Sequence, residues 1–88
     1  MAIAGEYKLY AISDDPHILT GLALAGVAGM PAHTPDELHQ ALVGISPDIG
    51  VVIVSSGLAA KSADIIEKYR EKNTMPLITI VPEMSDIK

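Results

Sequence analysis

The sequence predicts an α/β fold built on a four-stranded parallel sheet. Short aliphatic runs alternate along the chain with stretches of helical periodicity, a pattern typical of β-α-β units with right-handed crossovers. Ile, Leu, Val and Ala must form the core, because the chain has three tyrosines but no Phe or Trp. Such a core suits aliphatic strands covered by helices. The 88 residues provide room for a single domain, residues 1–88.

The first β-α-β unit begins with an apolar run, residues 8–13, which we interpret as a strand. Asp15 follows and can cap a helix whose first residue is Pro16, where a missing N–H costs nothing. Apolar residues then recur at helical spacing. Residues 27–32 form a weaker second strand, which Pro31 should confine to an edge of the sheet.

The second helix has the clearest start signal in the sequence. Thr34 is followed by Pro35 at the first helical position and by Glu37 three residues after the cap. This spacing predicts a capping box, in which Thr34 accepts from the Glu37 N–H and the Glu37 carboxylate reaches back. The stripe that should be buried consists of Leu38, Ala41, Leu42 and Ile45.

The last two strands flank the third predicted helix. Residues 49–54 are aliphatic at every position except Gly50, as expected of a strand buried on both faces. A helix is predicted over residues 58–72, with apolar residues facing inward and charged residues outward. Residues 75–81 form the fourth strand, which Pro82 ends.

The order of the elements predicts where the sheet is left bare. We expect strand order 2-1-3-4, a three-layer Rossmann/flavodoxin-like fold with helices on both faces. This order places the first helix on one face and the other two helices on the opposite face. One helix cannot cover four strands, so aliphatic surface should remain open near strands 3 and 4. The hypothesis places a partner-binding surface there, formed by Leu77, Thr79, Val81 and Met84.

Charge and composition exclude several classes of function. The formal net charge of −5 argues against nucleic-acid binding, which depends on Lys and Arg. The absence of cysteine excludes disulfides and thiolate sites. The start of the chain lacks the features of a signal peptide, and no apolar run approaches the ~20 residues of a membrane span. We therefore expect a cytoplasmic protein without direct membrane insertion.

The carboxyl ends of strands 1 and 3 form the crevice where flavodoxin-like sheets bind ligands. Asp14 and Asp15 lie there and could hold Mg²⁺ in a phospho-receiver, but Ser55 occupies the place of the phosphoacceptor carboxylate. The turn from Ser55 also resembles the phosphorylatable serine turn of STAS-type domains, in which an Asp stands where this chain has Val54. A receiver-like or STAS-like signalling domain regulated by phosphorylation is the alternative function.

Nothing else in the sequence predicts a chemical site. The three histidines lie on different predicted elements, and no Gly-rich phosphate loop occurs. No nucleophile has a general base nearby in sequence. We therefore predict no catalytic, cofactor-binding or metal-binding residues, and a protein that is not an enzyme.

Several segments resemble those of one known group of proteins, the F subunits of archaeal/vacuolar-type rotary ATPases. The opening strand with Asp14, the first-helix segment, the third strand with its turn, and the closing strand with its proline are similar to that family, in the same order and spacing. These segments are residues 7–12, 21–27, 49–55 together with 58–59, and 75–82. The family has an acidic turn after strand 3, whereas this sequence has Ser56 and Gly57.

The resemblance implies a function as well as a fold. It implies a Rossmann-like, non-catalytic domain of the central rotor stalk, which couples ATP hydrolysis or synthesis to proton or sodium transport. The implied partners are the coiled-coil D subunit and neighbouring subunits of a complex that is peripheral to the membrane. In the family a C-terminal helix follows and can extend along D. The 88 residues resemble the globular part alone.

Overall fold

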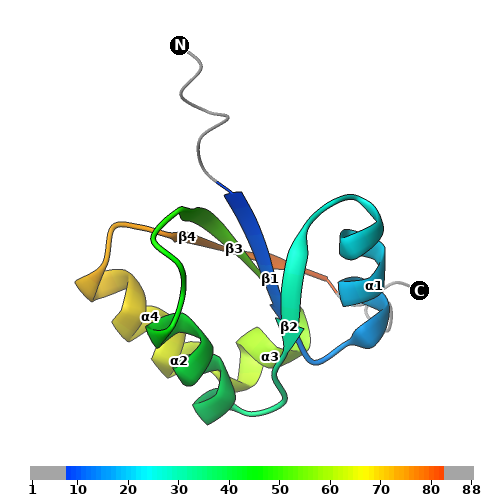
Figure 1. Ribbon diagram of the computed structural model, residues 1–88. Coiled ribbons are helices and arrows are strands. Elements are labelled where there is room, and N and C mark those ends of the chain that lie inside the picture. Colours follow the sequence, from blue (N-terminus) through cyan, green and yellow to red (C-terminus); the bar gives the residue numbers. More distant parts are fainter. Residues whose placement is uncertain (1–7, 83–88) are drawn as a thin grey trace.

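The computed structural model describes residues 8–82 and confirms the predicted sheet. Its four strands are all parallel and lie in the order β2-β1-β3-β4 (Figure 1). They are β1 (Lys8–Ser13), β2 (Ala28–Pro31), β3 (Ile49–Ser55) and β4 (Leu77–Val81). The strand that contains Pro31 is at an edge, as predicted, and β4 forms the other edge.

The helices lie on both faces of the sheet, but unequally. They are α1 (Pro16–Leu24), α2 (Pro35–Val43), α3 (Ser56–Lys61) and α4 (Ala63–Lys72). Figure 1 shows α1 on one side of the sheet and the other three helices on the opposite side. This is the distribution that strand order 2-1-3-4 requires, because each crossover is right-handed.

The prediction of one continuous helix over residues 58–72 is wrong. The chain leaves the helical conformation at Ser62, whose φ and ψ are −119° and 22°, and its N–H bonds to the Ala59 carbonyl at 3.1 Å rather than four residues back. The two short helices each contact β4. The bend at Ser62 allows the helical layer to stay packed along a twisted sheet. One straight helix would diverge from the sheet. That requirement is tertiary and has no local sequence signal.

Local capping positions α1 and α2. Asp15 Oδ1 accepts from the His17 N–H at 2.9 Å, and Thr34 Oγ1 accepts from the Glu37 N–H at 3.1 Å, as predicted. The Glu37 carboxylate, however, accepts from the His33 N–H at 2.6 Å, one residue before the cap. Both helix starts are therefore satisfied by side chains from the adjoining turns.

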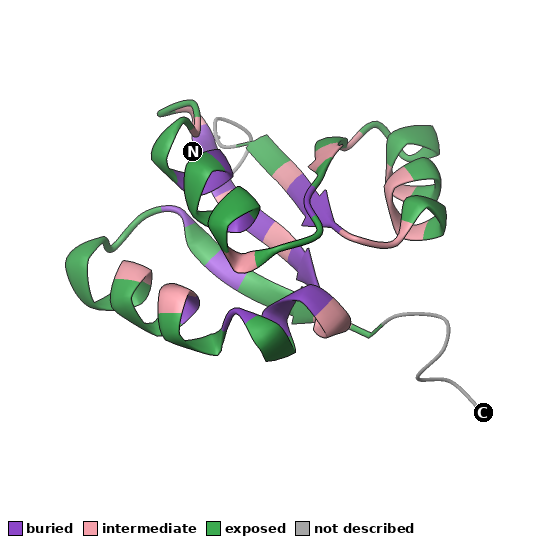
Figure 2. Cartoon of the chain, turned by 90° about the horizontal axis from the view of Figure 1, so that it is seen from below, coloured by how far each residue is buried: buried purple, intermediate pink, exposed green. Residues whose placement is uncertain are grey.

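The core lies almost entirely between the sheet and the three-helix layer. Figure 2 shows the buried residues gathered there, whereas α1 carries only exposed and half-buried residues. On the α1 side, β1 and β2 come so close that a Cβ on Gly29 would lie 2.6 Å from the Ala11 carbonyl oxygen. The largest fully buried apolar side chains are Ile12, Leu38, Leu42, Val52, Val54 and Leu58.

Candidate functional site

Aliphatic side chains are exposed on the α1 side of the sheet, beyond the part that α1 covers. Leu77 is 60% exposed and Leu9 is 45% exposed, which is unusual for residues within a parallel sheet. Strand register places Val51 beside both of them, so the three side chains form one row across β1, β3 and β4. We call the surface formed by Leu9, Val51, Ile53, Leu77, Thr79 and Val81 the open sheet face.

The open sheet face exists because α1 packs over only part of the sheet. Helix α1 contacts β1 and β2, and it follows directly on β1 in the chain. A right-handed crossover to β2 must return over those two strands, so it cannot reach β4. The opposite side of β4 is covered: α3 and α4 contact it, and Arg70 of α4 donates to the Ile78 carbonyl at 2.8 Å.

The structure places three of the four predicted residues on the open sheet face. Leu77, Thr79 and Val81 alternate outward along β4, while Ile78 points into the core and is 8% exposed. The intervening residues of β4, Ile78 and Ile80, lie on the covered side of the sheet. Ile80 shares the covered side but remains 47% exposed because β4 is an edge strand. Met84 lies outside the described residues.

Sequence reasoning missed the contribution of α1. A groove of about 570 Å³ runs along the edge of this helix and borders the open sheet face. Its lining residues are His17, Ile18, Gly21, Leu22, Ile53 and Val81. Ile18 and Leu22 are one helical turn apart and are not fully buried. Their i, i+4 spacing was visible in the sequence, but the extent of α1 over the sheet was not.

The crevice at the carboxyl ends of β1 and β3 contains the predicted polar residues, but Asp14 and Asp15 do not form an acidic pair there. Asp14 Oδ1 accepts from Ser55 Oγ at 3.1 Å, and Asp14 Oδ2 lies 3.7 Å from Lys61 Nζ. The Asp15 carboxylate turns to the start of α1 instead. The two carboxylates are thus engaged separately, one with Ser55 and one as a helix cap.

This crevice lacks the donor set of a phospho-receiver. Receiver chemistry needs a third carboxylate beside the acidic pair, and Ser55 occupies that place as a hydrogen-bond donor to Asp14. Within residues 8–82 no group of three His, Asp or Glu side chains is arranged to hold a metal ion. The three histidines lie on α1, on the turn before α2 and on α2. The donor chemistry of this crevice therefore does not favour the signalling alternative.

Comparison with known proteins agrees with the resemblance seen in the sequence. The family model described as ATP synthase (F/14-kDa) subunit matches residues 9–87. The chain is also 31% identical over 77 residues to the F subunit of the A-type ATP synthase of Methanosphaera stadtmanae, covering 85% of this chain and 73% of that protein. Over the part of the chain that the structure describes, none of the helices has the length and apolar character to span a bilayer. This chain belongs to the family of the ATP synthase (F/14-kDa) subunit, the F subunits of A/V-type rotary ATPases.

Proposed function

We propose that this protein is a non-catalytic central-stalk subunit that docks on the coiled-coil D subunit through the open sheet face. In this role it helps to couple ATP hydrolysis or synthesis to ion transport, from the cytoplasmic side and peripheral to the membrane. Membership in the family of F subunits supports a place in a multi-subunit complex. The single observation that carries the docking proposal is the uncovered aliphatic row formed by Leu9, Val51 and Leu77.

The dimensions of this row suit a helical partner. Three neighbouring strands span roughly 10 Å, because adjacent strands lie about 4.8 Å apart. An α-helix with its side chains is about 10–12 Å wide, so one helix can cover the row. A helix of a coiled coil that lies along β3 and β4 would therefore cover the half of this side of the sheet that α1 leaves bare.

The energy available from covering this surface is sufficient for specific docking. Burial of apolar surface contributes roughly 25 cal/mol per Å², so a patch of a few hundred Å² yields several kcal/mol on this side before association costs. The six side chains that form the open sheet face are all uncharged. Docking there requires little desolvation of charge, which favours affinity.

A charged substitution on the open sheet face tests the proposal. Leu77→Asp and Val81→Asp should each weaken binding to the D subunit at least about tenfold, since a carboxylate would have to be desolvated at the interface. Leu24→Asp is the matched control, because Leu24 is 86% exposed at the end of α1 and lines neither the face nor its groove.

Isothermal titration calorimetry of each variant with purified D subunit measures the affinity, and far-UV circular dichroism verifies the fold. Folded Leu77→Asp and Val81→Asp proteins that bind D as tightly as the wild type would refute docking through this surface. An equal loss of affinity in the Leu24→Asp control would show that any negative charge added on the α1 side of the protein weakens D binding. That result would also count against the proposal.

A further inference from the structure

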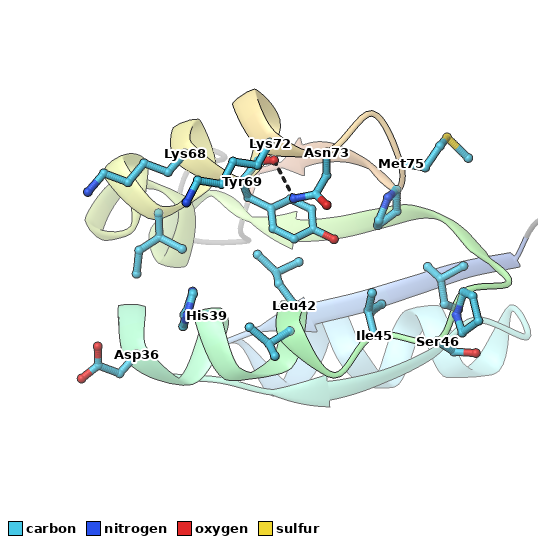
Figure 3. Close-up of a pocket in the computed structure, with 15 residues that line it drawn as sticks. Asp36, His39, Leu42, Ile45, Ser46, Lys68, Tyr69, Lys72, Asn73 and Met75 are labelled. Atoms are coloured by element: carbon cyan, nitrogen blue, oxygen red, sulfur yellow. Dashed lines mark hydrogen bonds between the residues drawn. The ribbon is translucent and has the colours of Figure 1, made fainter.

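A second exposed apolar surface lies on the opposite side of the molecule, between α2 and α4. Here a cleft of about 810 Å³ opens between the two helices (Figure 3). Leu42 and Ile45 line it from the α2 side and Tyr69 from α4, and Met75 lies at its end. Val43 and Met75, which also line it, are 69% and 42% exposed. The cleft is therefore an apolar surface that the described part of the chain leaves uncovered.

The cleft has a basic wall on an otherwise acidic protein. Lys68 and Lys72 lie one turn apart on α4 and both line the cleft. Among residues 8–82, neither lysine has an ion-pair partner, although the whole chain has a net charge of −5. The α2 wall carries His39 and Asp36, so the positive charge is confined to the α4 side. A ligand that fits this arrangement has an apolar ridge with carboxylates along one flank.

We propose that this cleft is a second docking site, for an amphipathic helix of another subunit whose carboxylates face Lys68 and Lys72. The proposal rests on the proposed function only in requiring that the chain be part of a multi-subunit complex. The occupant is assigned as a helix because a helix presents apolar residues at i, i+4 and i+7 with charges on the adjoining flank, which is the complement of these walls. The two sites lie on opposite sides of the sheet, so both can be occupied at once.

Site-specific cross-linking in the assembled complex tests the proposal. The chain has no cysteine, so Val43→Cys introduces a unique thiol at the rim of the cleft for a benzophenone label. In the rotary ATPase reconstituted with this variant, we expect illumination to join the label to another subunit. Peptide mass spectrometry should place the cross-link on a helical segment that carries carboxylates. Ala60→Cys, on the exposed part of α3 outside the cleft, is the control and should not label that segment.

Charge variants make the test specific to the basic wall. In the Val43→Cys background, Lys68→Glu combined with Lys72→Glu should lower the cross-link yield about tenfold at low salt, because like charges would then face each other. The matched pair Lys68→Arg and Lys72→Arg keeps the charge and should retain the yield. Raising the salt concentration should narrow the difference between the two double variants.

Several outcomes would overturn the proposal. One is a cross-link only to lipid, to a second copy of this chain or to a segment without carboxylates. Another is the absence of any cross-link in a complex that contains the labelled chain. A third is a cross-link yield that does not change when the charges of the two lysines are reversed. Failure of the proposed function is distinguishable, because it would appear as unchanged D binding by the Leu77→Asp variant. Loss of D binding on Leu77→Asp, together with no Val43→Cys cross-link in the assembled complex, would reject the cleft proposal alone.

Discussion

Asp48, in the turn before β3, shows how individual side chains hold the strands in register. Its carboxylate accepts a hydrogen bond from Ser46 Oγ and lies 3.2 Å from Lys8 Nζ at the start of β1. The Ser46 hydrogen bond, followed by the interaction with Lys8, lowers the pKa of Asp48 from its ordinary value. The Lys8 N–H also bonds to the Asp48 carbonyl at 3.0 Å. This residue therefore links the ends of two neighbouring strands.

The lowered pKa of Asp48 predicts an acid-dependent contribution to stability. A folded-state pKa below the unfolded value of about 3.9 means that the contribution is present above that pH and is lost as the pH falls through the folded pKa. Asp48→Asn should therefore unfold at a lower urea concentration than the wild type at pH 7, with the gap closing below about pH 4. The effect should be small because the pair is solvent-exposed. Urea midpoints measured at neutral pH and at acidic pH test it, and a gap independent of pH would contradict the assignment.

Residue-scale signals were predictable where the partner is close in sequence. The caps by Asp15 and Thr34 depend on backbone N–H groups two or three residues away, so the sequence contains the whole interaction. The bond between Asp14 and Ser55 joins residues 41 positions apart. That bond forms because the carboxyl ends of neighbouring parallel strands meet. The predicted strand order implied that the two residues share a crevice, but it did not predict the bond between them.

At the scale of the element, β4 separates a core face from a face available to a partner. Consecutive strand residues point to opposite sides, so Leu77 lies on the open sheet face while its neighbour Ile78 packs into the core cluster. Arg70 of α4 bonds to the Ile78 carbonyl and ties the helical layer to this edge strand. Leu77 and Ile78 are therefore adjacent aliphatic residues in opposite environments, one exposed and one buried, which suits them to a direct comparison of variants.

Truncation of these two residues should have very different effects on stability. Ile78→Ala should lower the free energy of unfolding by about 2–4 kcal/mol, because it removes buried methyl groups and leaves a cavity. Leu77→Ala should change it by less than about 1 kcal/mol, because most of the Leu77 side chain is already in water. Chemical denaturation of both variants provides the comparison. Equal losses would show that β4 is buried on both sides.

The break between α3 and α4 is the element that sequence periodicity could not predict. Apolar residues in positions 58–72 keep helical spacing on both sides of Ser62, and serine is tolerated in a helix. The Ser62 hydroxyl is buried and lacks a hydrogen-bond partner among the described residues. The break comes from packing two short helices on a twisted strand pair, which no local pattern records.

For the whole molecule, the main feature is the inequality of the two helical layers. The α2-α3-α4 side contains the core cluster, while α1 has no buried residue and packs on the sheet through partly buried residues such as Ile18, Leu19 and Leu22. Elements with few buried apolar contacts open locally at low free-energy cost. Helix α1 and the groove beside it are therefore the part of the described fold that is most easily opened.

Hydrogen exchange should reveal this inequality and its response to a partner. In the free protein, amides of α1 should exchange at least about tenfold faster than those of β1 and β3. On addition of D subunit, α1 should become more protected if the partner covers the groove at Ile18 and Leu22. Mass spectrometry of peptic peptides measures both states. Slow exchange of α1 in the free protein would show that the two layers are equally stable.

The sequence by itself determined the order of the strands, the parallel sheet, the presence of a helical region between successive strands and the side of the sheet left open near β4. These follow from short-range periodicity and from the handedness of crossovers, both of which depend on the local chemistry of the chain. Only the tertiary structure decided that Leu9 and Val51 join Leu77 in one row, that Ile18 and Leu22 border it, and that a basic cleft opens between α2 and α4. The reason is that strand register, helix placement and the gaps between helices depend on how distant segments pack. The sequence of any one segment does not determine the energy of that packing.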